Sequence, residues 1–234
     1  WETVGGKGFA SKKRIYKDGE NPFLDGTARY ARTEKKKNKA FAEWIPTIPQ
    51  TGNYAVYVSY QTLPNSVSDA KYIVFHKGGV TEFSVNQQIG GGTWVYLGTF
   101  EFDKGNNDYG MVVLSNESKE NGVVCADAVR FGGGMGNISR GGTVSGLPRY
   151  LEGARYSAQW AGMPYEIYGG RKGENDYADD INARSNTLNY LSGGSVFNPK
   201  EKGLGVPLEM TLALHSDAGY SKTDEIIGSL GISR

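Results

Sequence analysis

Short runs of alternating apolar and polar residues follow one another through the first 131 residues of the chain. Residues 54–62 (YAVYVSYQT) are typical, because every second residue from Tyr54 to Tyr60 is apolar and falls on one face of a strand. Turn-forming Gly, Asn, Asp and Lys residues separate the runs. The predicted strands cover residues 40–46, 54–62, 71–77, 80–86, 93–102, 110–116 and 122–131. Seven short strands at this spacing predict a jelly-roll-like antiparallel β-sandwich.

Two of these runs, residues 71–77 and 80–86, flank the pair Gly78-Gly79. Glycine adopts positive φ without strain, so a Gly-Gly pair between two strands predicts a tight hairpin. The composition points the same way, since the chain has 34 Gly and 15 Tyr. We therefore expect a mostly β fold.

The pattern changes near residues 132–137 (GGGMGN). A short helix is predicted around residues 150–160 and a longer one over residues 175–194. Acidic residues near the start of the longer helix complement its dipole, and Gly193-Gly194 ends it. The residues expected on its buried face are Ile181, Leu188 and Leu191.

The apolar run VPLEMTLALH (residues 206–215) predicts a strand buried on both faces, as in a parallel sheet. A helix followed by such a strand is typical of an α/β domain, but no other α/β repeat is visible. We assign residues 1–133 to the sandwich and residues 134–234 to a partial α/β segment. An incomplete sheet leaves an open edge, so we also expect a homodimer through this C-terminal part.

The charge and the length of the chain argue against some classes of function. The chain has 234 residues, 26 of them basic and 25 acidic, and this balance argues against a nucleic-acid binder. No run is long enough for a membrane span, and no signal peptide is visible. The first residue is Trp rather than Met, so we expect a piece of a longer protein. Cys125 lies in an apolar run without a partner cysteine, which predicts a buried free thiol.

His215 ends the apolar run and is one of only two histidines. The other, His76, lies in a sandwich strand and has no spacing relation to it, whereas catalytic zinc needs about three protein ligands. Judged from these residues alone, a hydrogen-bonded structural histidine is the favoured interpretation. Asp217 could act as a further ligand or orient one, although Ser216 and Asp217 also suit a simple turn.

The acidic run GENDYADD (residues 173–180) could bind Ca²⁺, but it lacks the spacing of an EF-hand, and acids at a helix N-terminus are the favoured interpretation. The glycine-rich stretches lack the GxxxxGK[ST] pattern of a phosphate loop and are interpreted as loops. Asp127 is predicted to be a partly buried carboxylate that holds a neighbouring loop.

Aromatic residues are the candidates for sugar binding, because rings can stack on pyranose faces while polar neighbours bind hydroxyls. The candidates are Trp44, Tyr57, Trp94 and Tyr96. Trp94 and Tyr96 share one face of their predicted strand, and Val95 and Leu97 share the other. One face must be core, and the sequence leaves open which one. Aromatic residues in sandwich strands are more often core than binding platform.

Several segments resemble known families. AEWIPTIPQTGNYAVYVSY, YIVFHKGGVTEFSVNQ, GGTWVYLGTFEF and VVCADAVRFGGG resemble the golvesin C-terminal-like, or xanthan lyase carbohydrate-binding-like, domain, over about residues 1–133. GMGNISRGG, SGLPRYLEGARYSAQWAGMP, NDYADDINARSNTLNYL and LALHSDAG resemble part of a zinc-dependent N-acetylmuramoyl-L-alanine amidase domain, as in Bacteroidetes proteins labelled xanthan lyase. That second resemblance implies that His215 is a zinc ligand and that Arg184 and Asn189 lie on the helix before it.

These resemblances imply a cell-wall or polysaccharide-directed protein, in which a glycan-binding sandwich is inserted in a peptidoglycan amidase-like hydrolase. In such an enzyme a zinc-bound water attacks the amide carbonyl. The family's other ligands would lie outside this chain, so zinc is expected in the full-length parent and none in this chain. The alternative is a non-catalytic carbohydrate-binding or adhesion module. Either implies a glycan or peptidoglycan partner and a secreted, periplasmic or cell-surface location in a bacterium.

Overall fold

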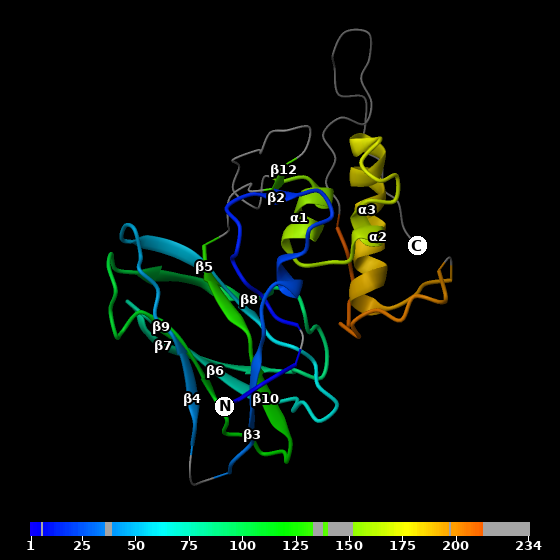
Figure 1. The fold of residues 1–234 in the computed structure, drawn as a ribbon. Coiled ribbons are helices and arrows are strands. Elements are labelled where there is room, and N and C mark those ends of the chain that lie inside the picture. Colours follow the sequence, from blue (N-terminus) through cyan, green and yellow to red (C-terminus); the bar gives the residue numbers. More distant parts are fainter. Residues whose placement is uncertain (6, 36–38, 133–137, 140–151, 197, 213–234) are drawn as a thin grey trace.

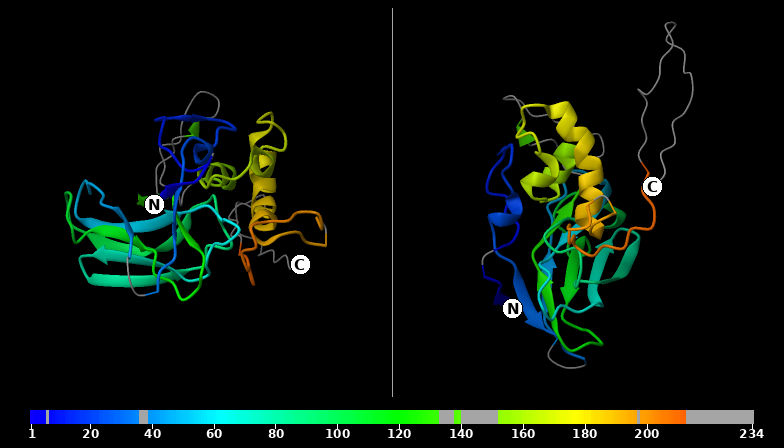
Figure 2. Two further views of the ribbon diagram at one scale, coloured as in Figure 1. Left: turned by 60° about the horizontal axis from the view of Figure 1, so that its bottom comes forward. Right: turned by 90° about the vertical axis from the view of Figure 1, so that its right-hand side faces the viewer.

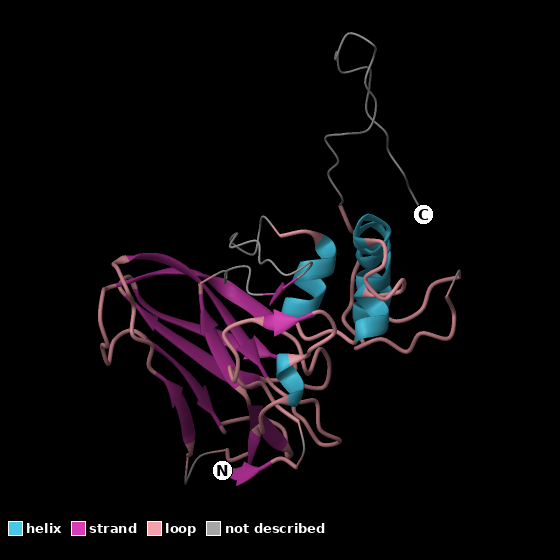
Figure 3. Ribbon diagram, turned by 45° about the horizontal axis from the view of Figure 1, so that its top comes forward, coloured by secondary structure: helices cyan, strands magenta, loops and turns pink. Residues whose placement is uncertain are grey.

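The computed structural model describes residues 1–5, 7–35, 39–132, 138–139, 152–196 and 198–212. Most of its strands form one body, and the helices lie beside it with the short strand pair β2-β12 (Figures 1 and 3). The strands are β1 (Glu2–Thr3), β2 (Tyr16–Lys17), β3 (Arg29–Arg32), β4 (Phe41–Trp44), β5 (Gly52–Ser59), β6 (Ala70–His76), β7 (Gly79–Val85), β8 (Val95–Phe102), β9 (Met111–Ser115), β10 (Val123–Ala126), β11 (Ala128–Phe131) and β12 (Ile138–Ser139). The helices are η1 (Pro22–Leu24), α1 (Ala154–Trp160), α2 (Tyr165–Tyr168) and α3 (Asp176–Ser192).

The predicted β-sandwich is confirmed. A four-stranded antiparallel sheet, β4-β9-β6-β7, faces a three-stranded sheet, β11-β5-β8, and a further sheet, β1-β3-β10, adjoins them. Alternation places Val56 and Val58 of β5 opposite Tyr72 and Leu114 in one buried cluster, which we call the sandwich core. Cys125 is buried in this core, as predicted, and burial raises the pKa of its thiol to about 11.

Two strand predictions need correction in detail. The hairpin between β6 and β7 is present, but Gly79 already pairs with His76, so the turn residues are Lys77 and Gly78. The single strand predicted over residues 122–131 is broken at Asp127. Before the break β10 pairs with β3, and after it β11 pairs with β5, because the chain changes sheets there. The first three strands, β1 to β3, were not predicted.

Both predicted helices form, but the buried face of α3 differs from the prediction. Asn175 caps α3 by accepting a hydrogen bond from the Ala178 amide at 3.0 Å, and the helix ends at Gly193, as expected. The residues buried on it are Asp179 and Ala183, whereas Ile181 is 44% exposed. The prediction is wrong for Ile181, because a buried ion cluster, described below, orients the start of the helix. Leu188 is half-buried, and Leu191 packs against the second hydrophobic cluster described below.

The buried strand predicted at residues 206–215 is wrong over its described part. No strand is present between residues 198 and 212, and Met210 is 86% exposed. The chain instead turns back along α3, where the amides of Leu204 and Val206 donate to the carbonyls of Tyr190 and Leu191. No described neighbouring strand is there to pair with this segment. His215 and Asp217 lie outside the described residues.

Among the described residues, no helix is both long and apolar enough to cross a membrane. The helices lie against the outer face of the β11-β5-β8 sheet together with the N-terminal segment (Figure 2). The contact buries a second cluster, which we call the aromatic cluster; it includes Tyr57, Trp94, Trp160, Met163 and Tyr168. Among the described residues, no helix lies on the outer face of the opposite sheet, β4-β9-β6-β7.

Candidate functional site

The structure shows which side of β8, and of Trp94 just before it, faces the core. Val95 and Leu97 pack against the sandwich core. Trp94 points to the opposite side and belongs to the aromatic cluster. Trp94 therefore faces the helices and the N-terminal segment, Tyr96 is 55% exposed, and neither ring fills the interior of the sandwich.

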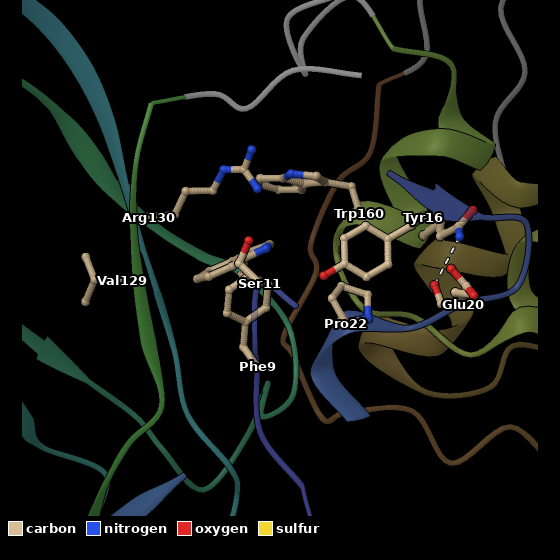
Figure 4. Close-up of a pocket in the computed structure, with 10 residues that line it drawn as sticks. Phe9, Ser11, Tyr16, Glu20, Pro22, Val129, Arg130 and Trp160 are labelled. Atoms are coloured by element: carbon tan, nitrogen blue, oxygen red, sulfur yellow. Dashed lines mark hydrogen bonds between the residues drawn. The ribbon is translucent and has the colours of Figure 1, made fainter. Parts of the chain in front are cut away.

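A pocket of about 270 Å³ opens beside Trp94, between the sheet, the N-terminal segment and α1 (Figure 4). We call it the aromatic pocket. Its lining residues are Phe9, Ser11, Tyr16, Glu20, Pro22, Trp94, Val129, Arg130, Gln159 and Trp160. Three separate parts of the chain build it, since residues 9–22 form one wall, the sheet a second and the end of α1 a third.

Aromatic contacts set the shape of the pocket. The ring centroids of Trp94 and Trp160 lie 5.9 Å apart, and Phe9 meets Trp94 edge-on at 4.9 Å. The Arg130 guanidinium lies over the Trp160 ring, 4.4 Å from its centroid, and Figure 4 shows it reaching from β11 toward that ring. A cation in this position is attracted by the negative face of the indole. Arg130 and Trp160 thus form one side of the pocket as a stacked pair.

Hydrogen bonds fix the wall made by the N-terminal segment. The Gln159 side-chain amide donates to the carbonyls of Lys17 at 2.7 Å and Glu20 at 3.0 Å, the latter drawn in Figure 4. The Glu20 carboxylate accepts from Lys13 Nζ at 2.6 Å and from the Lys17 amide at 2.8 Å. Both hydrogen bonds lower the pKa of Glu20, and the bond from Lys13 has the larger effect. The loop that carries Ser11 and Glu20 is therefore tied to α1.

Asp127 holds the same segment to the sheet. Its carboxylate accepts hydrogen bonds from the Phe9 amide at 2.8 Å and the Ser59 hydroxyl at 2.7 Å. The prediction of a partly buried carboxylate that holds a loop is confirmed. Burial raises the pKa of Asp127, and the two hydrogen bonds oppose that rise. The break between β10 and β11 thus positions one aromatic wall of the pocket.

A buried arginine joins the helices to the N-terminal segment. Arg155 of α1 is fully buried, and its guanidinium lies 2.7 Å from Asp18, 2.8 Å from Asp176 and 3.4 Å from Asp179. Asp179 also accepts hydrogen bonds from the amides of Arg171 and Gly173. These contacts explain why a carboxylate, rather than Ile181, occupies the buried face of α3. We call this group the Arg155 cluster.

Acidic residues of the run at 173–180 therefore pair with Arg155 and also lie at the N-terminus of α3. Within the part of the chain that the structure describes, no group of three or more His, Cys, Asp or Glu residues is arranged to hold a metal ion. His76 is engaged with its own hairpin: its ring nitrogens lie 3.0 Å from the Thr81 hydroxyl and 3.2 Å from the Gly78 amide. The described residues thus do not fit a zinc or calcium site.

The four aromatic candidates occupy different environments. Trp94 lines the aromatic pocket. Tyr57 is buried between Trp160 at 5.6 Å and Tyr96 at 5.3 Å, and Tyr96 is 55% exposed. Trp44 is half-buried and lies apart from these three, in a second hollow of about 330 Å³ that Trp1 and Phe41 also line.

Sequence reasoning missed several lining residues, among them Phe9, Tyr16, Arg130 and Trp160. One signal was present in the sequence. Arg130 interrupts the apolar run AVRF, and a charged residue in a sandwich strand marks a face that does not point to the core. Nothing in the sequence links it to Trp160, which lies thirty positions later.

Comparisons with known proteins find similarity in the first part of the chain. Residues 22–133 match the family model of the Golvesin C-terminal domain. The xanthan lyase of Bacillus sp. (strain GL1) is 36% identical over 90 residues, which cover 38% of this chain and 10% of that protein. The solved structure of a Paenibacillus xanthan lyase is 26% identical and covers 55% of this chain and 12% of its own, with a TM-score of 0.41.

The chain therefore contains a golvesin/xanthan lyase-like domain. It spans about a tenth of the length of the xanthan lyases that it matches. The match runs from residue 22 to residue 133, so it includes Trp94 and Arg130 of the aromatic pocket but neither Phe9, before it, nor Trp160, after it. The amidase-like resemblance of residues 134–234 stays a prediction.

Proposed function

We propose that this chain is a glycan-binding module and that the aromatic pocket is its binding site. One observation carries the proposal: two indole rings, Trp94 and Trp160, meet in a pocket that also offers a guanidinium and a hydroxyl. Apolar walls with a few convergent polar groups are typical of small-ligand sites. The golvesin/xanthan lyase-like domain supports a polysaccharide-directed role.

The direct test compares two tryptophans. Binding of the full chain to xanthan and to a neutral glucan would be measured by affinity gel electrophoresis, for the wild type, Trp160→Ala and Trp44→Ala. We expect Trp160→Ala to weaken binding about tenfold or more, as truncation of a buried aromatic anchor does. Trp44→Ala is the matched control, since it removes the same ring from the other hollow. Circular dichroism would verify that both variants fold.

The opposite result would assign the glycan site to the hollow that contains Trp44. If Trp44→Ala lost binding and Trp160→Ala kept it, the hollow lined by Trp1 and Trp44 would be the glycan site. If neither substitution changed binding, both hollows would be excluded. If the wild-type chain bound no glycan, the proposed function itself would fail.

Peptidoglycan is the other partner that we propose, with a secreted or cell-surface location, on the basis of the amidase-like segments. That proposal depends on LALHSDAG, of which residues 213–219 lie outside the described residues. Zinc content after purification without chelator tests it, with His215→Ala as the variant and His76→Ala as the control. Stoichiometric zinc that only His215→Ala removes would support a metal site completed beyond the described residues. Absence of zinc from all three proteins would leave the glycan-binding module as the function of this chain.

A further inference from the structure

The last segment that the structure describes, residues 206–212 (VPLEMTL), presents apolar side chains to solvent. Leu208, Met210 and Leu212 are 39%, 86% and 80% exposed. They stand at every second position, so in an extended chain they share one face, and Glu209 and Thr211 share the other. Single exposed apolar residues are ordinary, whereas a row of them on one face is typical of an interaction surface. We call residues 208–212 the exposed segment.

The backbone just before the exposed segment is held by two other parts of the chain. The amides of Leu204 and Val206 donate to carbonyls at the end of α3, at 2.8 Å and 2.9 Å, and the Gly90 amide of the sandwich donates to the Leu204 carbonyl at 3.1 Å. After Val206 this support ends, since no backbone hydrogen bond joins residues 207–212 to any other described residue. The exposed segment therefore starts from a fixed point, and its backbone suits pairing with a partner strand.

The sequence of the exposed segment fits an antiparallel pairing with a second copy of itself. With Met210 on the two-fold axis, Leu208 lies opposite Leu212 of the second copy, and Glu209 lies opposite Thr211. A register centred on Glu209, or an in-register parallel pairing, would instead bring two Glu209 carboxylates together, which is unfavourable. Pro207 limits the ladder at its start because it has no amide hydrogen to donate. Charge and backbone chemistry thus favour the register centred on Met210.

We infer that two copies of this chain associate through residues 208–212, which pair as antiparallel strands about a two-fold axis at Met210. A symmetric pairing uses the same surface of both copies, so it closes at two and does not grow into a fibre. It gives partners to the backbone groups of both segments and gathers their apolar side chains on one face. The ladder is short, so we expect a reversible dimer with a Kd on the order of 100 µM. The inference is independent of the proposed glycan binding.

Cysteine cross-linking tests the register. In Met210→Cys the two new thiols would lie opposite each other, with Cα atoms about 4.5–5.5 Å apart, which is within the range of a disulfide. Mild oxidation should therefore convert this variant to a covalent dimer, seen on a non-reducing gel. Thr211→Cys is the matched control, because residue 211 faces Glu209 of the second copy, and we expect it to cross-link several-fold more slowly. The native Cys125 is buried and should not compete.

Sedimentation equilibrium tests the association itself, with the full chain at about 10–500 µM, a range that brackets the expected Kd. Met210→Lys would place two like charges at the axis and should weaken the dimer about tenfold or more. Val196→Lys is the control, since Val196 lies in the loop after α3 and is 88% exposed, and it should leave the dimer unchanged. Circular dichroism would verify that both variants fold.

Three results would overturn the inference, each in a different way. A wild-type chain that stays monomeric at the highest concentration would refute the dimer and leave the exposed segment to a sheet edge elsewhere in a longer protein. A dimer that Met210→Lys does not weaken would have to form through another surface. Equal cross-linking of Met210→Cys and Thr211→Cys would refute the register. None of these results depends on whether the chain binds a glycan.

Discussion

The sheet β11-β5-β8 separates two hydrophobic clusters that are built in different ways. On its inner side, the sandwich core consists of Val, Ala, Leu, Ile, Tyr and Phe residues, most of them from strands, with one cysteine. On its outer side, the aromatic cluster gathers rings from loops and short helices, and the buried polar residues Arg155, Gln159 and Asp179 lie around it. The first cluster draws mainly on paired strands. The second joins the sheet to the N-terminal segment and to the helices after the sandwich.

This difference suggests that the sandwich core supplies the stability of the chain and the aromatic cluster supplies its binding site. The sandwich core is supported by backbone ladders that satisfy their own polar groups. The aromatic cluster depends on a few specific side-chain contacts, among them the Arg155 cluster and the bond from Asp127 to Phe9. We therefore expect the sandwich to fold as the stable unit and the pocket to depend on contacts that can be removed singly.

The largest effect is expected from Leu114→Ala in the sandwich core. Leu114 is fully buried on β9, and truncation of such a side chain lowers the free energy of unfolding by about 2–5 kcal/mol. Urea unfolding followed by circular dichroism and by tryptophan fluorescence would shift together, because the pocket cannot persist without its sheet. Ile73→Ala, on the outer face of neighbouring β6, is the control and should cost less. An equal cost at both positions would contradict the assignment of the core to one face.

Arg155→Ala should have a comparable but local effect. It leaves the buried Asp179 and the nearby Asp18 without their cation, and removal of one partner from a buried ion group costs about 3–5 kcal/mol. Hydrogen exchange should accelerate in α1, α3 and residues 9–24 while β5 to β9 stay protected. The thiol of Cys125 offers a second measurement, since its buried position and high pKa should keep alkylation slow in this variant.

A double variant sharpens the interpretation of that result. Arg155→Met combined with Asp179→Leu removes both buried charges and should recover part of the lost stability, because an apolar pair needs no compensation. If Arg155→Ala instead accelerated exchange and Cys125 alkylation throughout the sandwich, the two clusters would be a single cooperative unit.

The two clusters also differ in how far the sequence predicts them. The alternation of apolar and polar residues predicted the strands of the sandwich and the inner face of β5. In a sandwich strand every second side chain points to the core, so the sequence pattern and the burial pattern agree. It failed on α3, where Asp179 is buried because Arg155, 24 positions earlier, requires a carboxylate there. It also failed at residues 207–212, because an apolar run becomes a strand only if a neighbouring strand is available.

The candidate site was predictable only in part. Trp94 was among the candidates for sugar binding, but the other indole of the pocket comes from α1, beyond the sandwich. The contact between Arg130 and Trp160 depends on how α1 docks on the sheet. That docking is fixed by polar contacts such as those of Gln159, which have no sequence period. The total charge of +1 also does not show that residues 7–17 carry five basic residues and no acidic one.

The smallest effect concerns Asp127, which lies where the two clusters meet and joins Phe9 to Ser59. Burial raises its pKa above the ordinary value of 3.8, so the folded protein holds this proton more tightly than the unfolded chain. The associated stability is fully present below about pH 3.8 and is lost as the pH rises through the folded pKa. Asp127→Asn cannot ionise, and its amide can still accept from Phe9 and bond Ser59.

The free energy of unfolding of Asp127→Asn, relative to wild type, should therefore increase between pH 3.5 and pH 7, with urea midpoints as the measurement. Asp108→Asn, which removes an exposed carboxylate, serves as the control and should run parallel to wild type. If the wild type instead became more stable relative to Asp127→Asn as the pH rises, the hydrogen bonds to the ionised carboxylate would outweigh the cost of burying its charge. Asp127 would then be a charged anchor of the pocket wall, and glycan binding should weaken in the asparagine variant as well.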